Sequence, residues 1–186
     1  MRTQPEPVRR AALAEAAIAE IGARGSLDVT VARIAKRAGM SPALAHHYFG
    51  SKDRMLVAAM RHILRDLGFS VRVELAEAKT PKDRLDAIVA ACLAPRTFER
   101  DIVAAWLTFY VHAQHDAGTR RLLHVYQRRL RSNLVHAARP LTHQPERLAE
   151  TVGALIDGLY VRHALSDTDP AAAIALVRDT IRKALR

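Results

Sequence analysis

Cysteine is almost absent from this chain, in which Cys92 is the only thiol among 186 residues. A lone cysteine excludes a disulfide within the chain and is typical of proteins from a reducing compartment. No apolar run approaches the ~20 residues that a membrane-spanning helix needs. The N-terminal stretch before Val8 lacks the apolar core of a signal peptide. We therefore expect a cytoplasmic protein that has no membrane partner.

Aromatic residues are scarce as well, at 5% of the composition. We find no stretch in which Val, Ile or Thr alternates with polar residues, as a half-buried strand would require. Ala, Leu and Arg are abundant instead, and these residues favour helices. Since 49% of the residues are apolar, the chain can bury a core. We predict an all-α protein.

Acidic residues are in the minority, because 19 Asp and Glu stand against 29 Lys and Arg and leave a formal net charge of +10. Residues 1–64 contain ten of the basic and five of the acidic side chains, so positive charge is denser there than in the rest. Such a balance suits a polyanionic partner such as DNA. A solvated, Arg-rich surface would have the same composition, so charge alone leaves both interpretations open.

Hydrophobic periodicity, together with Gly and Pro residues at the expected helix boundaries, predicts nine helices. Three of them begin with a hydroxyl side chain that can cap a helix, at Thr30, Ser41 and Thr80. Pro42 and Pro81 then stand at the favoured first helical position. The expected helices span residues 6–24, 31–38, 42–49, 52–78, 81–94, 98–116, 118–138, 145–165 and 170–185.

The segment 28–54 has the outline of a helix-turn-helix, which places its second helix in the major groove of DNA. Ala35 is small enough to let two short helices pack closely, and Gly39 can adopt the positive φ of a tight turn. The apolar faces between the helices can be formed by Ile34, Ala38, Met40, Ala45 and Tyr48. DNA binding is the favoured interpretation, and an ordinary helical hairpin is the alternative.

The string from Ile34 to Leu56 resembles the signature of the TetR family of transcriptional repressors. The resemblance implies a nine-helix fold with a helix-turn-helix DNA-binding domain in residues 1–52 and a ligand-binding and dimerisation domain in residues 53–186. Two positions of the recognition helix depart from the family pattern, where Ala43 replaces the common glycine and His46 the common tyrosine. No base preference is therefore carried over to this chain.

Chemistry and resemblance together suggest two groups of contacts with double-stranded operator DNA. The candidates for contacts with the phosphate backbone are Thr30, Arg33, Ser41, Tyr48 and Lys52. The candidates that face the groove are Pro42, Ala43, Leu44 and His46, with His47 suited to either role. Any one of these side chains can instead belong to a solvated helix face.

Three C-terminal segments, which start at Ala104, Arg128 and Ala154, resemble the choline-responsive branch of the same family. This resemblance implies a homodimeric repressor of the genes that convert choline to glycine betaine, released from its operator by choline. The apolar faces of the last two helices are expected to form the dimer interface. One alternative is a TetR-type repressor of an efflux or catabolic operon that responds to another cationic or lipophilic small molecule. Another is an all-helical protein whose Arg-rich faces bind acidic partners.

Choline carries a quaternary ammonium group, which cannot donate an N–H hydrogen bond and is commonly held by aromatic faces. Trp106, Phe109 and Tyr110 follow the i, i+3, i+4 spacing and therefore share one helix face. The candidate ligand-binding residues are Trp106, Phe109, Tyr110, Tyr126, Asp157 and Tyr160. An aromatic stripe is equally compatible with plain core packing. Asp157 can complement the cation or make a hydrogen bond at a subunit interface.

Motifs of enzymes and of cofactor sites are missing from the sequence, which has no phosphate-binding loop, no His-Glu-x-x-His and no Cys cluster. His112, His115 and Asp116 could suggest a metal site. A solvated helix face explains them better, because a structural metal site needs further ligands. We predict a DNA-binding repressor that is not an enzyme and uses neither a metal nor a cofactor.

Overall fold

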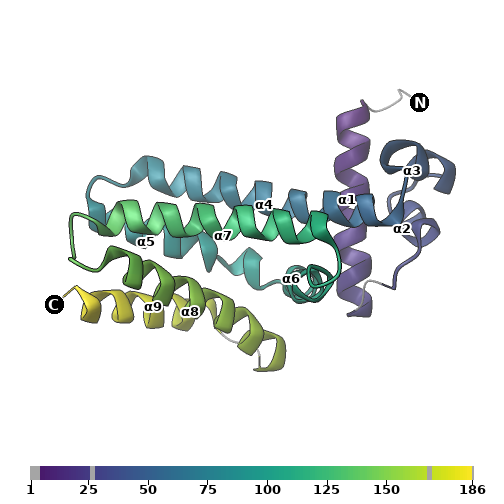
Figure 1. The fold of residues 1–186 in the computed structure, drawn as a ribbon. Coiled ribbons are helices and arrows are strands. Elements are labelled where there is room, and N and C mark those ends of the chain that lie inside the picture. Colours follow the sequence, from purple (N-terminus) through teal and green to yellow (C-terminus); the bar gives the residue numbers. More distant parts are fainter. Residues whose placement is uncertain (1–4, 26–27, 167–168, 186) are drawn as a thin grey trace. The chain divides into compact units, whose positions relative to one another are not determined.

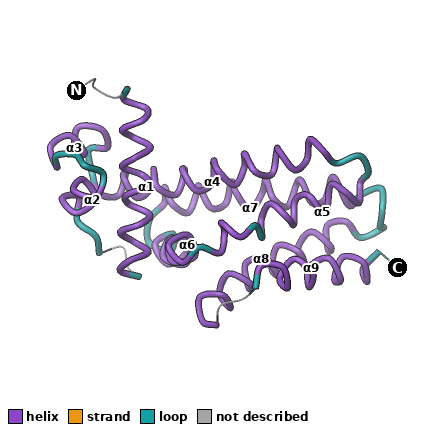
Figure 2. The backbone as a smooth tube through the Cα atoms, turned by 180° about the vertical axis from the view of Figure 1, so that it is seen from behind, coloured by secondary structure: helices purple, strands orange, loops and turns teal. Residues whose placement is uncertain are grey.

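Helices and the turns between them account for residues 5–25, 28–166 and 169–185, which are the residues that the structure, a computed structural model, describes. These ranges hold nine α-helices and one short 3₁₀-helix, η1, without a strand (Figure 2). The predicted all-α fold is confirmed. The elements are α1 (Glu6–Arg24), α2 (Val31–Arg37), α3 (Pro42–Phe49), α4 (Lys52–Glu77), α5 (Pro81–Cys92), η1 (Pro95–Phe98), α6 (Arg100–His112), α7 (Ala117–Ala138), α8 (Pro145–Ser166) and α9 (Pro170–Ala184).

The hydroxyl caps predicted from the sequence are present at the starts of α2, α3 and α5. The Thr30 hydroxyl oxygen accepts a hydrogen bond from the Arg33 amide at 3.3 Å, and that of Ser41 accepts one from the Leu44 amide at 3.2 Å. Thr80 caps α5 in the same way. These bonds satisfy amides that have no partner within their own helix, which is why the helix starts could be located from sequence.

The sixth helix is shorter than the predicted span of 98–116. α6 covers only Arg100–His112, and the preceding residues form η1. At the other end, the Asp116 carboxylate accepts a hydrogen bond from the Thr119 amide at 2.6 Å. Interaction with the Thr119 side chain and, next, this amide bond lower the pKa of Asp116. Because Asp116 caps the start of α7, the chain has left α6 before it.

One compact unit consists of the residues up to 65 together with residues 100–120. Within this unit, which holds the predicted helix-turn-helix and is named the DNA-binding unit after that prediction, α1 packs against α6 and α2, and α2 packs against α3 (Figure 1). The approach of α1 to α6 is close, because a Cβ atom at Gly22 would overlap the backbone of Asp101. The largest side chains buried in this unit are Leu13, Ile21, Ile34, Met55, Leu56, Met60, Trp106 and Phe109.

A second compact unit consists of residues 66–99 and 121–186. Here α9 packs against both α8 and α5, and the Arg178 guanidinium lies 3.3 Å from the Asp86 carboxylate, which ties α9 to α5. The two units share α4 and α7, each of which contributes residues to both. The predicted division after residue 52 is one of functions, and it stays a prediction.

The core of this second unit surrounds Cys92, whose side chain is fully buried. The Tyr160 hydroxyl donates a hydrogen bond to the Cys92 carbonyl oxygen, and the Phe98 ring lies 5.6 Å from the Tyr160 ring between centroids. Burial, with a smaller effect from Asp157, raises the pKa of the Cys92 thiol to about 12. The thiol therefore stays protonated and acts as a small apolar core group.

Candidate nucleic-acid interface

The predicted recognition helix, α3, buries one side and exposes the other. Ala45 is fully buried and Tyr48 is only 7% exposed, so these two side chains anchor the helix. The residues of α3 that are exposed are Pro42, Ala43, His46 and His47, with Leu44 half-buried. Every residue predicted to face the groove therefore keeps accessible surface.

The starts of α2 and α3 carry exposed hydroxyl groups. Thr30 and Ser41 are both exposed. Each hydroxyl oxygen already accepts an amide of its own helix, which leaves its O–H available as a donor to a phosphate oxygen. The helix dipole adds partial positive charge at the same point.

The predicted phosphate contact Arg33 is oriented by a buried carboxylate that belongs to α1. Glu20 is 5% exposed, and its carboxylate oxygens lie 2.7 Å from Nε of Arg37 and 3.2 Å from Nε of Arg33. The hydrogen bond from Arg37 is the main reason that the pKa of Glu20 is lowered, and the bond from Arg33 adds to it. Glu20 thus fastens α2 to α1.

Lys52 begins α4 and is half-buried, with its ammonium nitrogen 4.0 Å from the carboxylate of exposed Asp28. An ion pair of this length at the surface contributes little to stability. The ion pair with Asp28 therefore does little to fix the Lys52 side chain.

Tyr48 differs from the other predicted phosphate contacts, because most of its side chain is buried. Its ring lies beneath two guanidinium groups of α1, at 5.3 Å from Arg9 and 5.2 Å from Arg10 between guanidinium carbon and ring centroid. The His47 ring meets it edge-on at 5.5 Å. The main observed role of Tyr48 is to pack the end of α3 against α1.

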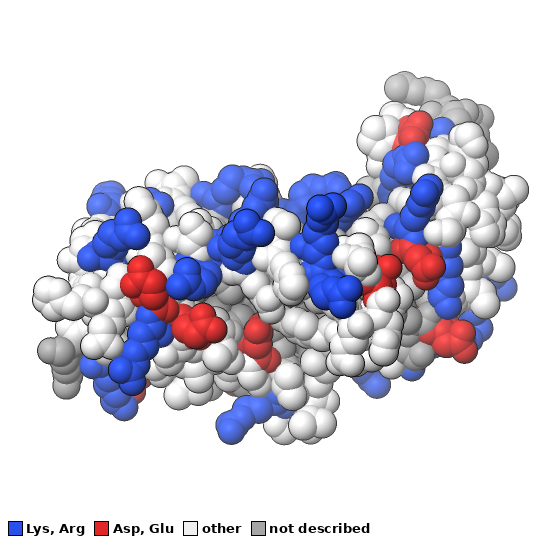
Figure 3. Space-filling model, in the orientation of Figure 1, with Lys and Arg blue, Asp and Glu red and all other residues white. Residues whose placement is uncertain are grey.

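Basic side chains are spread over most of the face of the protein shown in Figure 3, whereas Asp and Glu are confined to a few places. In the DNA-binding unit, several acids are paired with bases, among them Glu6 with Arg10 and Glu20 with Arg33 and Arg37.

The three aromatic side chains predicted on α6 are present in the DNA-binding unit with different burial. Trp106 is 2% exposed and Phe109 is fully buried, while Tyr110 is half-buried. The rings of Trp106 and Tyr110 lie 5.9 Å apart between centroids, as expected for neighbours on one helix face. This burial suits both a core stripe and the wall of a ligand cage.

The other predicted ligand residues belong to the second unit, where an open cleft of about 580 Å³ lies between α7 and α8. Tyr126 and Asp157 both line this cleft. Tyr160 does not line it and instead donates its hydroxyl hydrogen to a backbone carbonyl group. The predicted convergence of these residues with the α6 aromatics stays a prediction.

Two sequence models of protein families match the chain. One, described as "Bacterial regulatory proteins, tetR family", matches residues 13–59, and the other, described as "BetI-type transcriptional repressor, C-terminal", matches residues 81–186. The HTH-type transcriptional regulator BetI of Brucella anthropi is 56% identical over 180 residues, which cover 95% of this chain and 93% of that protein. The chain belongs to the BetI-type branch of the TetR family.

A second curated BetI-type relative, from Agrobacterium fabrum, is 49% identical over 178 residues, which cover 94% of this chain and 86% of the relative. These relatives are transcriptional regulators, and this BetI-type chain is accordingly a DNA-binding transcriptional repressor and not an enzyme. Every DNA contact predicted from sequence, from Thr30 to Lys52, lies within the region matched by the TetR model.

Solved structures share the fold at lower identity. A putative transcriptional regulator from Pseudomonas aeruginosa PAO1 has a TM-score of 0.85 at 23% identity and covers 99% of this chain and 93% of its own. A putative regulator from Saccharomonospora viridis, solved in complex with choline, has a TM-score of 0.80 at 23% identity, with coverages of 96% and 97%. TetR-type regulators bind operator DNA as dimers and respond to small molecules.

Sequence reasoning missed two residues, Glu20 and Arg10, which connect the first three helices of this BetI-type chain. These helices, α1, α2 and α3, are called the reading head below. Glu20 follows Leu13 and Ala17 at helical spacing on the buried side of α1, so an acid there was a signal that a partner was needed. Arg10 gave no such signal, because its partners on α3 are distant in sequence.

Among the described residues, no group of three His, Cys, Asp or Glu side chains could hold a metal ion. None of the described helices has the length and apolar character needed to cross a membrane.

Proposed function

We propose that this BetI-type repressor controls the genes that convert choline to glycine betaine and that choline releases it from its operator in the cytoplasm. The observation that carries the proposal is the 56% identity to BetI of Brucella anthropi over 95% of the chain. The match extends through the C-terminal segment 81–186. Ligand-binding regions of TetR-type regulators usually diverge, so likeness there supports a common effector.

On the DNA side, α3 enters the major groove and the N-termini of α2 and α3 contact phosphates. His46 is the best hydrogen-bonding base reader in the groove set, and Ala43 and Leu44 are suited to thymine methyl groups. The proposed groove residues are Pro42, Ala43, Leu44, His46 and His47. The proposed phosphate contacts are Thr30, Arg33, Ser41, Tyr48 and Lys52.

On the ligand side, aromatic rings surround the quaternary ammonium group of choline and Asp157 complements its charge. Each ring contributes about 0.5–2 kcal/mol, depending on how far the cation is desolvated. The proposed ligand residues are Trp106, Phe109, Tyr110, Tyr126, Asp157 and Tyr160.

The functional form is a homodimer, because two reading heads are needed for two half-sites about one helical turn apart. Apolar side chains of α8 and α9 that are exposed in the single chain support this, namely Val161, Leu165 and Leu176. Choline then shifts the equilibrium toward a state in which the two heads no longer match the half-site spacing.

A gel-shift assay with the DNA upstream of the protein's own gene tests the proposal, with choline, glycine betaine and betaine aldehyde each titrated into the complex. We expect retardation of that fragment and release by choline alone. Release by an unrelated cation or lipophilic compound, with no effect of choline, would instead make the protein a TetR-type repressor of an efflux or catabolic operon.

A further inference from the structure

The recognition helix α3 is too short to hold its own position. It contains eight residues, Pro42–Phe49, and an isolated helix of this length is unstable in water. Its orientation on the DNA-binding unit therefore depends on contacts at its two ends. Ser41 caps the N-terminal end.

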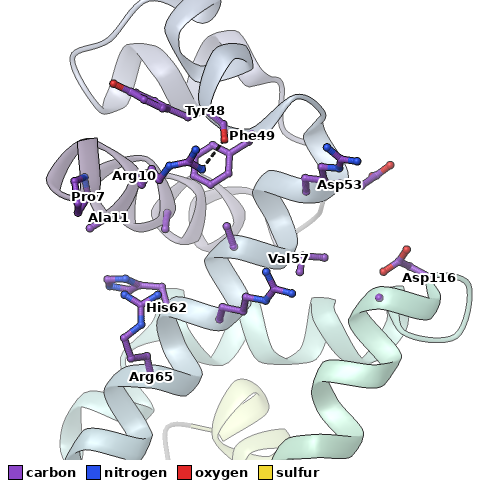
Figure 4. A pocket seen from close by; sticks show the side chains of 15 residues that line it. Pro7, Arg10, Ala11, Tyr48, Phe49, Asp53, Val57, His62, Arg65 and Asp116 are labelled. Atoms are coloured by element: carbon purple, nitrogen blue, oxygen red, sulfur yellow. Dashed lines mark hydrogen bonds between the residues drawn. The ribbon is translucent and has the colours of Figure 1, made fainter. Parts of the chain in front are cut away.

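At the C-terminal end, the last carbonyl groups of a helix have no partner within the helix. Arg10 of α1 supplies one, because its guanidinium donates a hydrogen bond to the Tyr48 carbonyl oxygen at 2.6 Å (Figure 4). A cation at this end also complements the negative pole of the helix dipole. The same guanidinium is oriented by Glu6, one turn earlier in α1, at 2.7 Å.

The aromatic side chains at this end of α3 add to the contact. The Arg10 guanidinium carbon lies 5.2 Å from the centroid of the Tyr48 ring and 5.3 Å from that of the Phe49 ring. One side chain of α1 therefore holds both the backbone and two rings of α3. Its other surface lines a cleft of about 740 Å³ whose remaining walls include α4 residues such as Arg61.

We infer that Arg10 is a positioning residue for operator recognition: it fixes the C-terminal end of α3 on α1 and so sets the angle at which α3 meets the groove. This inference rests on the proposed role of α3 in reading DNA. Arg10 acts through α3 and makes no contact with DNA itself.

The first test uses the free protein and needs no operator. Hydrogen exchange, followed by mass spectrometry on peptides that cover residues 42–54, is compared for wild type, Arg10→Ala and Arg10→Lys. We expect exchange at the end of α3 to become about tenfold faster in Arg10→Ala, because a hydrogen bond to a charged donor is lost. Arg10→Lys restores most of the protection, since an ammonium group can still donate to the carbonyl.

The matched control is Arg61→Ala, which removes the same charge from the same cleft on α4. It leaves exchange in residues 42–54 unchanged. If Arg10→Ala fails to fold, Glu6→Gln replaces it, because that variant keeps Arg10 but removes the group that orients it; we expect a smaller acceleration at the same peptides. Unchanged exchange in the folded Arg10 and Glu6 variants overturns the inference.

The second test measures the dissociation constants for upstream and scrambled duplexes as a function of salt. Substituting a positioning residue should change the affinity for the specific duplex and leave the affinity for non-specific DNA unchanged. We expect Arg10→Ala to weaken binding to the upstream duplex by about tenfold and to leave binding to the scrambled duplex and the salt slope unchanged. Equal losses on both duplexes, with a slope reduced by about one, would make Arg10 a direct phosphate contact and overturn the inference.

The two tests keep this inference separate from the proposed function. If wild type fails to bind its upstream DNA, the proposed function fails, while the exchange experiment still decides whether Arg10 holds α3. If wild type binds and both Arg10 variants match it in affinity and exchange, the proposed function stands and the inference fails.

Discussion

Glu20 lies on the buried side of α1, where its carboxylate accepts hydrogen bonds from Arg37 and Arg33. These bonds hold the pKa of Glu20 below its ordinary value of 4.5, and the bond from Arg37 has the larger effect. A carboxylate whose pKa is lowered by folding adds stability at pH values above its unfolded pKa. That contribution is lost as the pH falls through the lowered value of the folded state. Glu20 therefore stabilises the DNA-binding unit at neutral pH and ceases to do so in acid.

We expect Glu20→Gln to lower the free energy of unfolding by about 1–2 kcal/mol at neutral pH, because the amide cannot replace a charge shared by two guanidinium groups. The expected loss of unfolding free energy is this small because both arginines are about half exposed, so solvent screens their charges. Urea denaturation at neutral pH, and again well below pH 4.5, measures it. Glu15→Gln is the control, since exposed Glu15 pairs with His62 at 3.5 Å and lies outside the Glu20 cluster. A loss for Glu20→Gln that is the same in acid would contradict the charge argument.

Trp106 offers a direct readout of the proposed ligand cage, because it is the only tryptophan of the chain. If its ring contacts the quaternary ammonium group, choline should change its fluorescence saturably, over the concentration range in which the protein leaves its operator. Fluorescence titration with choline, and with glycine betaine as the control, measures this. Release of DNA without any change in emission would assign Trp106 to the core alone.

At the scale of helices and turns, the sequence predicted what local chemistry decides. Hydroxyl caps, first-position prolines and Gly39, whose φ is +66°, marked the starts and the turn of the reading head. The predicted end of α6 was wrong by four residues, because Asp116 caps the next helix instead of extending this one. The contacts of Arg10 and Glu20 could not be predicted, since both depend on which helices pack together.

Two helix glycines should respond in opposite ways to the same substitution. Gly22→Ala should be strongly destabilising, because the added Cβ would overlap the backbone of Asp101 where α1 meets α6. Gly68→Ala on α4 should stabilise by about 0.5–1 kcal/mol, since its added Cβ meets only the flexible end of Arg72 at 3.7 Å. Thermal unfolding of the two variants measures both effects. Equal tolerance at the two positions would contradict the close packing of α1 on α6.

At the scale of the whole molecule, repression that a ligand relieves requires coupling between ligand binding and DNA binding. The fold class, the reading head and the family could be predicted from sequence because they depend on local motifs. The ligand residues could not be established in the same way, because buried aromatics such as Trp106 and Phe109 meet the demands of a core and of a cage equally well. Coupling, by contrast, is a measurable free energy that acts in both directions.

The most direct test of the central claim is the dissociation constant of choline, measured by isothermal titration calorimetry on the free protein and on the protein saturated with its operator. The proposed mechanism predicts weaker choline binding to the operator complex, by the same factor by which choline weakens operator binding. Because typical coupling free energies lie at about 1–3 kcal/mol, we expect a factor of roughly 5–150. Equal choline affinity in the two states would contradict the account.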